Sequence, residues 1–583
     1  MKPFALTVLC SCFAFYLPAN AADVTSPWGV ATSSSGMKSA GEWMPRLREA
    51  GATTARAFPE WPTIEPRRGE WDWTKADALV KAATDNHFEI TACMMGTVPW
   101  SGEKPHTFPM SDLNGWSGFI GQSVARYKDR IHHWEVWNEG NGGFNGGHHT
   151  SADYGRLAAA TYAAVKKADP SAQVGLTTAS FDPAYLHRAI LAQKVAGTPG
   201  QFDYLCIHPY ELADGIGRPN GEIPYLWMTH LLRDVLQDSA PDKANADIWI
   251  TEIGRNVAKR QDQPAAEREA AASLVKLYVM AIAQGIRHVQ WFEAQDPVGE
   301  EPGFGLLQRD GTPRASYNAF KAMTAMLGPT PKYLGWLALG DGGRCFGFVF
   351  QGPSTPVLVA WKAAGDEDQQ LTFRANVQVR TLADFAPKPL EGGDVLTLGD
   401  DPVFIANLPA YLTGEAAGNR ELPFPWGGDF SRVHTVSMDF AAPVPNAGLY
   451  QAGPQTNQHV TFPDGTGGML VGANQATRFH VHPSFASILT REYNVRLTVR
   501  RVAPGNVGMN LHYEVADSQG GAPYRNVGTW FALKKDEGWQ TYTWHIKDAC
   551  FAKMWGYDIA FVPEQSQPFA IGKVEVSTEP FAN

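Results

Sequence analysis

Two glutamates in the chain have the surroundings expected of a catalytic carboxylate pair. Glu139 closes the run Trp-Glu-Val-Trp-Asn138-Glu139, and Glu252 follows the apolar run Trp-Ile-Thr. Each glutamate stands at the end of a segment that has the pattern of a buried strand. Cleavage of a glycosidic bond needs two such groups, because one carboxyl protonates the leaving oxygen while the other attacks the anomeric carbon or activates water. The pair therefore predicts chemistry on a glycoside.

Other polar and aromatic residues end further strand-like runs. Arg56 stands in Thr-Ala-Arg-Ala-Phe, His208 and Tyr210 in Ile-His-Pro-Tyr, and Trp291 in Gln-Trp-Phe-Glu. A guanidinium and a phenol can stabilise a carboxylate, and an indole offers a flat face to the C–H side of a pyranose ring. These residues are the expected companions of the pair.

The elements that must position these side chains alternate regularly. From about Trp28 to Gly328, short β-branched or aromatic runs alternate with helical patterns, which is typical of βα units around a parallel sheet. Eight strands are predicted: Trp28–Ala31, Thr53–Phe58, Glu89–Val98, His132–Glu139, Gln173–Ser180, Phe202–Tyr210, Asp247–Gly254 and Arg287–Gln295. Together they predict an α/β protein with a (β/α)8 TIM barrel over residues 24–328, in which the C-terminal strand ends meet at one mouth.

The rest of the chain has the pattern of two all-β regions. After Leu327-Gly-Pro-Thr-Pro331 the helical period disappears, and residues 332–408 predict a small β domain. A Pro/Gly-rich stretch from Pro409 to Gly428 then leads to residues 430–583, which predict a C-terminal β-sandwich similar to the carbohydrate-binding modules of polysaccharide-degrading enzymes. Glycan binding and a purely structural role are equally open for this sandwich, because Trp530, Trp539 and Trp544 could all be core residues.

Composition excludes several classes of protein. The 583 residues are too many for a single core, and the net charge of −10, without any basic run, argues against nucleic acid as a partner. The six cysteines are too few for a disulfide scaffold and show no CxxC spacing. We therefore expect no metal site and no cofactor, while the oligomeric state is not indicated.

The N-terminus has the features of a secretory signal peptide. Lys2 precedes an apolar run from Phe4 to Leu17, and Ala19-Asn20-Ala21 fits a cleavage site, so residues 1–21 predict a signal peptide and secretion, extracellular or periplasmic. The apolar run is shorter than the roughly 20 residues that a spanning helix needs. No membrane span is expected here or later in the chain.

Taken together, Arg56, Trp137-Asn138-Glu139, His208-x-Tyr210, Glu252 and Trp291 resemble the retaining (β/α)8 glycoside hydrolases of clan A, which include the cellulase-type and β-xylosidase/iduronidase-type families. The resemblance spans roughly residues 24 to 420. It implies that Glu139 is the acid/base, that Glu252 is the nucleophile, and that Asn138 holds the sugar 2-hydroxyl. Arg56, Asn138, His208, Tyr210 and Trp291 are then the predicted substrate-binding residues, and a carbohydrate is the expected partner.

Physical chemistry supports the same division of roles. A proton donor near neutral pH needs a raised pKa, which partial burial and the charge of Glu252 would give to Glu139. Glu252 must stay ionised, and Arg56 and Tyr210 would favour its charged form if they lie beside it. The predicted function is that of a secreted retaining glycosidase that cleaves β-glycosidic bonds in an oligo- or polysaccharide.

Alternatives remain open at this stage. The same residues would serve a transglycosylase, and a non-catalytic glycan-binding protein could keep the cleft, although it has no need for a buried carboxylate pair. Glu135 is interpreted as a charge inside the barrel rather than a catalytic group, and Glu293 as a weaker candidate for contact with substrate. Trp61 and Trp100 follow strand ends and could line the cleft or belong to the core.

Overall fold

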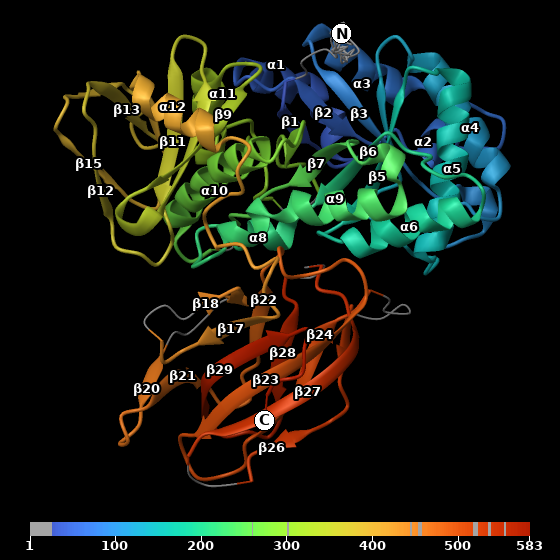
Figure 1. The fold of residues 1–583 in the computed structure, drawn as a ribbon. Helices are drawn as coiled ribbons and strands as arrows, with labels where there is room; N and C mark the ends of the chain where they lie inside the picture. Colours follow the sequence, from blue (N-terminus) through green and yellow to red (C-terminus); the bar gives the residue numbers. More distant parts are fainter. Residues whose placement is uncertain are drawn as a thin grey trace, which may run out of the picture.

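A computed structural model describes residues 26–582 apart from 259, 300–301, 443–445, 453–457, 517–522, 535–537 and 553–555. The predicted signal peptide at residues 1–21 lies outside the described residues. Within them, the chain forms a barrel with a small β region beside it and a sandwich below (Figure 1). No described helix is both long and apolar enough to cross a membrane.

The N-terminal region is a closed barrel of parallel strands in chain order, which confirms the predicted fold class. Its strands are β1 (Trp28–Ala31), β2 (Thr54–Ala57), β3 (Glu89–Met94), β4 (His133–Val136), β5 (Gln173–Ala179), β6 (Tyr204–His208), β7 (Asp247–Ile253) and β8 (Val289–Phe292). Each lies inside a predicted segment, but most end earlier than predicted. Asn138, Glu139 and Tyr210 therefore stand in the segments that follow their strands, where the backbone is free to aim side chains over the barrel mouth.

Helices surround this barrel, and their buried faces lie against the strands. The longest described helix, α10, begins after Asp262, whose side chain accepts a hydrogen bond from the backbone N–H of Ala265. The barrel helices are α1 (Ala40–Glu49), α2 (Trp61–Ile64), α3 (Thr74–Asp85), α4 (Leu113–Tyr127), α5 (Ser151–Ala168), α6 (Pro183–Val195), α7 (Tyr210–Ala213), α8 (Glu222–Leu226), α9 (Met228–Ser239), α10 (Gln263–Ala283) and α11 (Ala315–Leu327).

An antiparallel sheet follows the barrel. Its order is β14-β13-β16-β11-β10-β9, with β12 and β15 paired separately. The bounds are β9 (Lys332–Leu339), β10 (Cys345–Gln351), β11 (Pro356–Lys362), β12 (Gln369–Thr372), β13 (Val377–Thr381), β14 (Lys388–Leu390), β15 (Val395–Leu398) and β16 (Val403–Ala406). The Pro/Gly-rich stretch after it is not an open linker, because helix α12 (Ala410–Asn419) packs on β9 and the Trp426 ring joins the barrel's hydrophobic core.

The C-terminal region has two antiparallel sheets with a continuous apolar core between them. One sheet contains β18-β17-β29-β21-β20 with β23 and β27, and the other contains β19-β22-β28-β24-β25 with β26. The bounds are β17 (Thr435–Asp439), β18 (Asn446–Ala447), β19 (Leu449–Ala452), β20 (His459–Thr461), β21 (Gly467–Val471), β22 (Thr477–Val481), β23 (Arg491–Arg501), β24 (Gly508–Glu514), β25 (Tyr524–Asn526), β26 (Phe531–Ala532), β27 (Gln540–Ala549), β28 (Ile559–Pro563) and β29 (Phe569–Ser577).

The sandwich packs against the barrel below α8 and α9 (Figure 1). The ring of Trp227, between these two helices, contacts His482 at a centroid distance of 4.9 Å. Ala184 of α6 forms a buried cluster with Cys550 and Ala552 of the sandwich. Apolar side chains from both regions therefore share one interface.

Candidate active site

The barrel brings Glu139 and Glu252 to the same place at its mouth. One carboxylate oxygen of each, together with a ring nitrogen of His208, lie within 4.8 Å of one another. The side chains of Glu139 and Glu252 are 19% and 12% exposed. The two carboxyl groups are thus close together, largely desolvated and still open to a molecule that enters the mouth.

The backbone that carries Glu139 adopts a rare conformation. Trp137 and Glu139 have φ angles of 63° and 47°, in the left-handed region that side chains other than glycine seldom occupy. The Trp137 ring is held by a hydrogen bond of 2.8 Å from its Nε1–H to the carbonyl of Phe144. Strain of this kind persists only where the surroundings hold it, and it concentrates at functional sites.

Arg56 is the centre of the buried network beneath the pair. Its guanidinium donates to Glu135 Oε2 at 2.7 Å, to Glu252 Oε2 at 2.9 Å and to Asn138 Oδ1 at 2.8 Å. The residue has no solvent exposure. Burial by itself would lower the pKa of Arg56, but the carboxylates of Glu135 and Glu252 hold that pKa well above its usual range. The charge is therefore permanent, and two carboxylates share it.

Both oxygens of Glu252 accept hydrogen bonds, because Tyr210 O–H donates to Oε1 at 2.9 Å while Arg56 donates to Oε2. Burial raises the pKa of Glu252 and the charge of Glu139 adds to the rise, whereas His208, Arg56 and Tyr210 oppose it. Burial also raises the pKa of Glu139, where the charge of Arg56 opposes it. Glu252 has the two donors that stabilise an anion, so the arrangement favours a proton on Glu139 and a charge on Glu252.

His208 joins the two carboxylates from the side of β6. Its Nδ1 lies 2.8 Å from Glu139 Oε1 and 3.9 Å from Glu252 Oε2. Burial lowers the pKa of this fully buried imidazole to about 4. The ring is therefore neutral at physiological pH, with a proton on one nitrogen only.

The same three residues could hold a cation on distance alone, since each offers one ligand atom to a common point. However, the guanidinium of Arg56 already lies 2.9 Å from Glu252 and supplies the positive charge that these carboxylates need. A second cation would be repelled by it. The donor set suits acid–base and nucleophilic chemistry better than metal binding.

The predicted substrate-binding residues fall into two groups. Tyr210 is partly exposed at the mouth, whereas Arg56, His208, Asn138 and Trp291 are at most 3% exposed. Arg56 and His208 have no exposed face and contact the carboxylates, so their direct contact with substrate stays a prediction. Trp291 donates its Nε1–H to the carbonyl of Phe304 at 3.2 Å and shows no open ring face, so sugar stacking on it stays a prediction, as does a sugar contact for Asn138.

Sequence reasoning missed Cys93 and Thr251 as members of the site. Cys93 accepts from Arg56 at 3.3 Å and donates to the carbonyl of Trp137 at 3.0 Å, which ties the network to the strained segment. Thr251 Oγ1 lies 3.2 Å from His208 Nε2. In the sequence, both residues occupy ordinary buried strand positions, and neither belongs to a motif that would indicate a functional role. The Glu293 residue is 2% exposed, so its carboxylate does not add an open acidic group to the barrel mouth.

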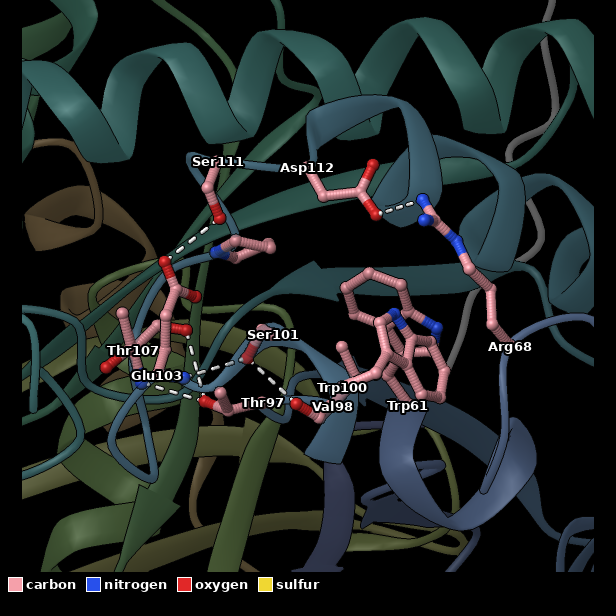
Figure 2. A pocket seen from close by; sticks show the side chains of 11 residues that line it. Trp61, Arg68, Thr97, Val98, Trp100, Ser101, Glu103, Thr107, Ser111 and Asp112 are labelled. Atoms are coloured by element: carbon pink, nitrogen blue, oxygen red, sulfur yellow. Dashed lines mark hydrogen bonds and ion pairs between the residues drawn. The ribbon is translucent and has the colours of Figure 1, made fainter.

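A separate pocket lies beside the end of β3 (Figure 2). It has a volume of about 280 Å³, and its lining includes Trp61 and Trp100, whose rings meet edge to face at 6.1 Å. Arg68 and Asp112 form an ion pair at its rim. Trp61 is 1% exposed and belongs to the core, while Trp100 is partly exposed, so of these two indoles Trp100 is the more accessible from the pocket.

Known proteins resemble parts of this chain. The family model of glycosyl hydrolase family 10 matches residues 19–174. Endo-1,4-beta-xylanase A of Fusarium oxysporum f. sp. lycopersici is 28% identical over 97 residues, which are 16% of this chain and 29% of that protein. Endo-1,4-beta-xylanase 1 of Gibberella zeae is 29% identical over 97 residues, 16% of this chain and 27% of that protein. The chain thus spans less than a third of the length of these relatives.

Among solved structures, a family 39 glycoside hydrolase from Bacteroides cellulosilyticus WH2 shares the fold. It has a TM-score of 0.54 and 21% identity, over 65% of this chain and 80% of that one. The family 10 model matches residues 19–174 of this chain, and the structural likeness, at 21% identity, shows a shared barrel fold.

Proposed function

We propose that the protein is a retaining glycosidase that cleaves β-glycosidic bonds in an oligo- or polysaccharide by double displacement. The observation that carries the proposal is the carboxylate pair, whose oxygens approach within 4.8 Å at the barrel mouth. Retaining enzymes place their carboxyl groups about 5 to 5.5 Å apart, whereas inversion needs about 6.5 to 9.5 Å to leave room for water. The short separation supports retention.

In the first step, Glu252 attacks the anomeric carbon while Glu139 gives its proton to the leaving oxygen. The C–O bond to the leaving group breaks and a glycosyl ester forms on Glu252. The charge of Glu252 is lost in this ester, so the pKa of Glu139 falls and its carboxylate can accept a proton from water. Water then cleaves the ester and restores both groups.

The sugar is proposed by analogy only. The similar fungal proteins are named endo-1,4-beta-xylanases, which makes β-1,4-linked xylan and its oligosaccharides the first substrates to test. Secretion is proposed from the pattern of residues 1–21. It predicts that the mature protein begins near Ala22, which N-terminal sequencing of exported protein would check.

The test combines a substrate panel with product stereochemistry. Purified protein is incubated with xylan, other plant, algal and bacterial glycans and aryl β-glycosides, and the first product is followed by NMR before mutarotation. We expect cleavage of at least one β-glycoside with the β-anomer appearing first. Initial release of the α-anomer would remove Glu252 from the nucleophile's role, and no cleavage of any β-glycoside would refute the activity.

A further inference from the structure

We infer that Thr251 is a positioning residue that determines which ring nitrogen of His208 carries the proton, and through His208 directs the proton of Glu139 towards the substrate. The inference rests on the proposed function for its catalytic consequence. Its structural part, the state of the His208 ring, can be tested without any substrate.

The strand β7 is irregular at this position. Ile250 pairs with Val289 of β8, but the next pair is Ile253 with Trp291, so three steps on β7 match two on β8. In a regular strand, successive side chains point to opposite faces, so that Thr251 and Glu252 could not both reach the barrel interior. An extra residue in one strand re-aims its side chains, often next to active sites. Here both residues reach the same polar network.

Thr251 is fully buried, and its hydroxyl lies 3.2 Å from His208 Nε2 and also contacts the Cys206 thiol. The opposite nitrogen, Nδ1, lies 2.8 Å from Glu139 Oε1. The other ionisable groups that act on His208 are Glu252, Arg56 and Glu135, and burial keeps the ring neutral among them. A neutral imidazole has one N–H donor and one acceptor nitrogen, so the bond at one end fixes the role of the other.

We assign the Thr251 hydroxyl as the donor to Nε2 in this 3.2 Å contact, which leaves the ring proton on Nδ1. Nδ1–H then donates to Glu139 Oε1, and that oxygen is occupied as an acceptor. The transferable proton of Glu139 consequently resides on Oε2, the oxygen left for the leaving group. In the second step, Oε2 takes the proton back from water, and His208 keeps its own proton throughout. The ring thus orients Glu139 in both steps without exchanging protons with it.

Removal of the hydroxyl should release this constraint. In Thr251→Val, which has nearly the same shape, Nε2 loses its donor and the ring is free to move its proton from Nδ1 to Nε2. We expect kcat/KM for a glycoside with a poor leaving group to fall about tenfold. This loss is smaller than the 10²- to 10⁴-fold rate increase that a positioned general acid contributes, because Glu139 itself remains in place. We expect kcat/KM for a 2,4-dinitrophenyl glycoside, which needs no acid, to stay within about twofold. Thr251→Ser should restore both values.

The matched control is Thr178→Val on β5. Thr178 is equally buried, but its hydroxyl donates to the carbonyl of the adjacent Ala179. This variant should affect the two leaving groups equally. An equal loss on both substrates in Thr251→Val would overturn the inference, because it would indicate general damage or a direct effect on Glu252. If the valine variant does not fold, Thr251→Ala replaces it with the same expectation.

The state of the ring is measured separately by ¹⁵N NMR of histidine-labelled protein, with the His208 signals assigned from their absence in a His208→Gln variant. We expect the Nδ1–H form in the wild type and a shift towards the Nε2–H form in Thr251→Val. An unchanged tautomer would overturn the inference even if the enzyme proved active. An inactive wild type with the expected tautomer shift would refute the proposed function and the catalytic step but retain the role of Thr251 on the ring.

Discussion

The barrel and the sandwich both bury charged residues, but only the barrel network described here has one end that is partly open to solvent. In the barrel, Arg56 connects side chains from different strands, and Glu252 stays partly open to the mouth. In the sandwich, the fully buried Glu514 and Asp558 accept hydrogen bonds from the backbone N–H groups of Ala552 and Val481, and His480 lies 3.9 Å from Asp558, with neither carboxylate open to solvent. Carboxylates enclosed on all sides can only fix the structure around them, whereas a network of side chains with one exposed end can act on a ligand. Burial of charge alone therefore does not mark a site.

The sharpest test of this contrast is a pair of charge-neutralising variants. Glu252→Gln should reduce turnover on a natural substrate by about 10²- to 10⁴-fold, because the nucleophilic carboxylate is gone. The melting temperature should change little, because Arg56 keeps Glu135 as its anionic partner. Glu514→Gln in the sandwich should leave kcat unchanged and lower the melting temperature. Steady-state kinetics and thermal unfolding of both purified variants check this, and wild-type rates for Glu252→Gln would break the comparison.

The next test concerns the centre of the barrel network. Arg56→Met leaves the carboxylates of Glu135 and Glu252 without their shared cation, and removal of one partner of a buried ion pair costs about 3 to 5 kcal/mol. Denaturant unfolding should show a loss of this size, together with loss of activity. Arg56→Met combined with Glu135→Gln should recover part of the stability, and a fully stable single variant would show that the charges are not coupled.

The apolar core of the sandwich should respond in stability alone. Trp544 is 2% exposed and packs against Phe531 and Phe561, so Trp544→Ala should destabilise the sandwich by about 3 to 5 kcal/mol. Because Trp544 lies in the core between the two sheets, kcat/KM on a small aryl glycoside should remain close to the wild-type value below the unfolding temperature. A large fall in kcat/KM of the still-folded variant would mean that the sandwich is part of the catalytic unit.

The smallest expected effect lies where the two regions meet. Glu211, beside Tyr210, is next to Gly556 of the sandwich, and burial raises its pKa to about 8. A carboxyl with a raised pKa binds more protons when folded, so it lowers stability as pH rises from about 4.5 through about 8. Glu211→Gln should therefore reduce the fall of the melting temperature with pH over this range. We expect the melting temperature of the variant to exceed that of the wild type by a few degrees, with the largest difference above pH 8. An unchanged pH profile would contradict the raised pKa.

Local patterns along the chain were sufficient for the fold class and for the positions of Glu139 and Glu252 near the ends of their strands. The alternation of strand-like and helical runs predicted the barrel, and each observed barrel strand lies within its predicted segment. The segment containing Glu139 and the run before Glu252 predicted that both would stand at strand ends. These features are local, because hydrophobic periodicity and turn residues act over a few positions. Strand ends were less accurate, since termination depends on neighbouring strands that a single segment does not contain.

Only the tertiary structure decided which partners these residues have. Arg56 lies between Glu135, Asn138 and Glu252, and the buried Trp291 ring donates its Nε1–H to the carbonyl of Phe304. Such distances depend on how eight strands close around a barrel, which no single segment encodes. The irregular pairing at Ile250 and Ile253 is the clearest case: alternation along β7 would have pointed Thr251 away from the site, and the pairing with β8 places it beside His208.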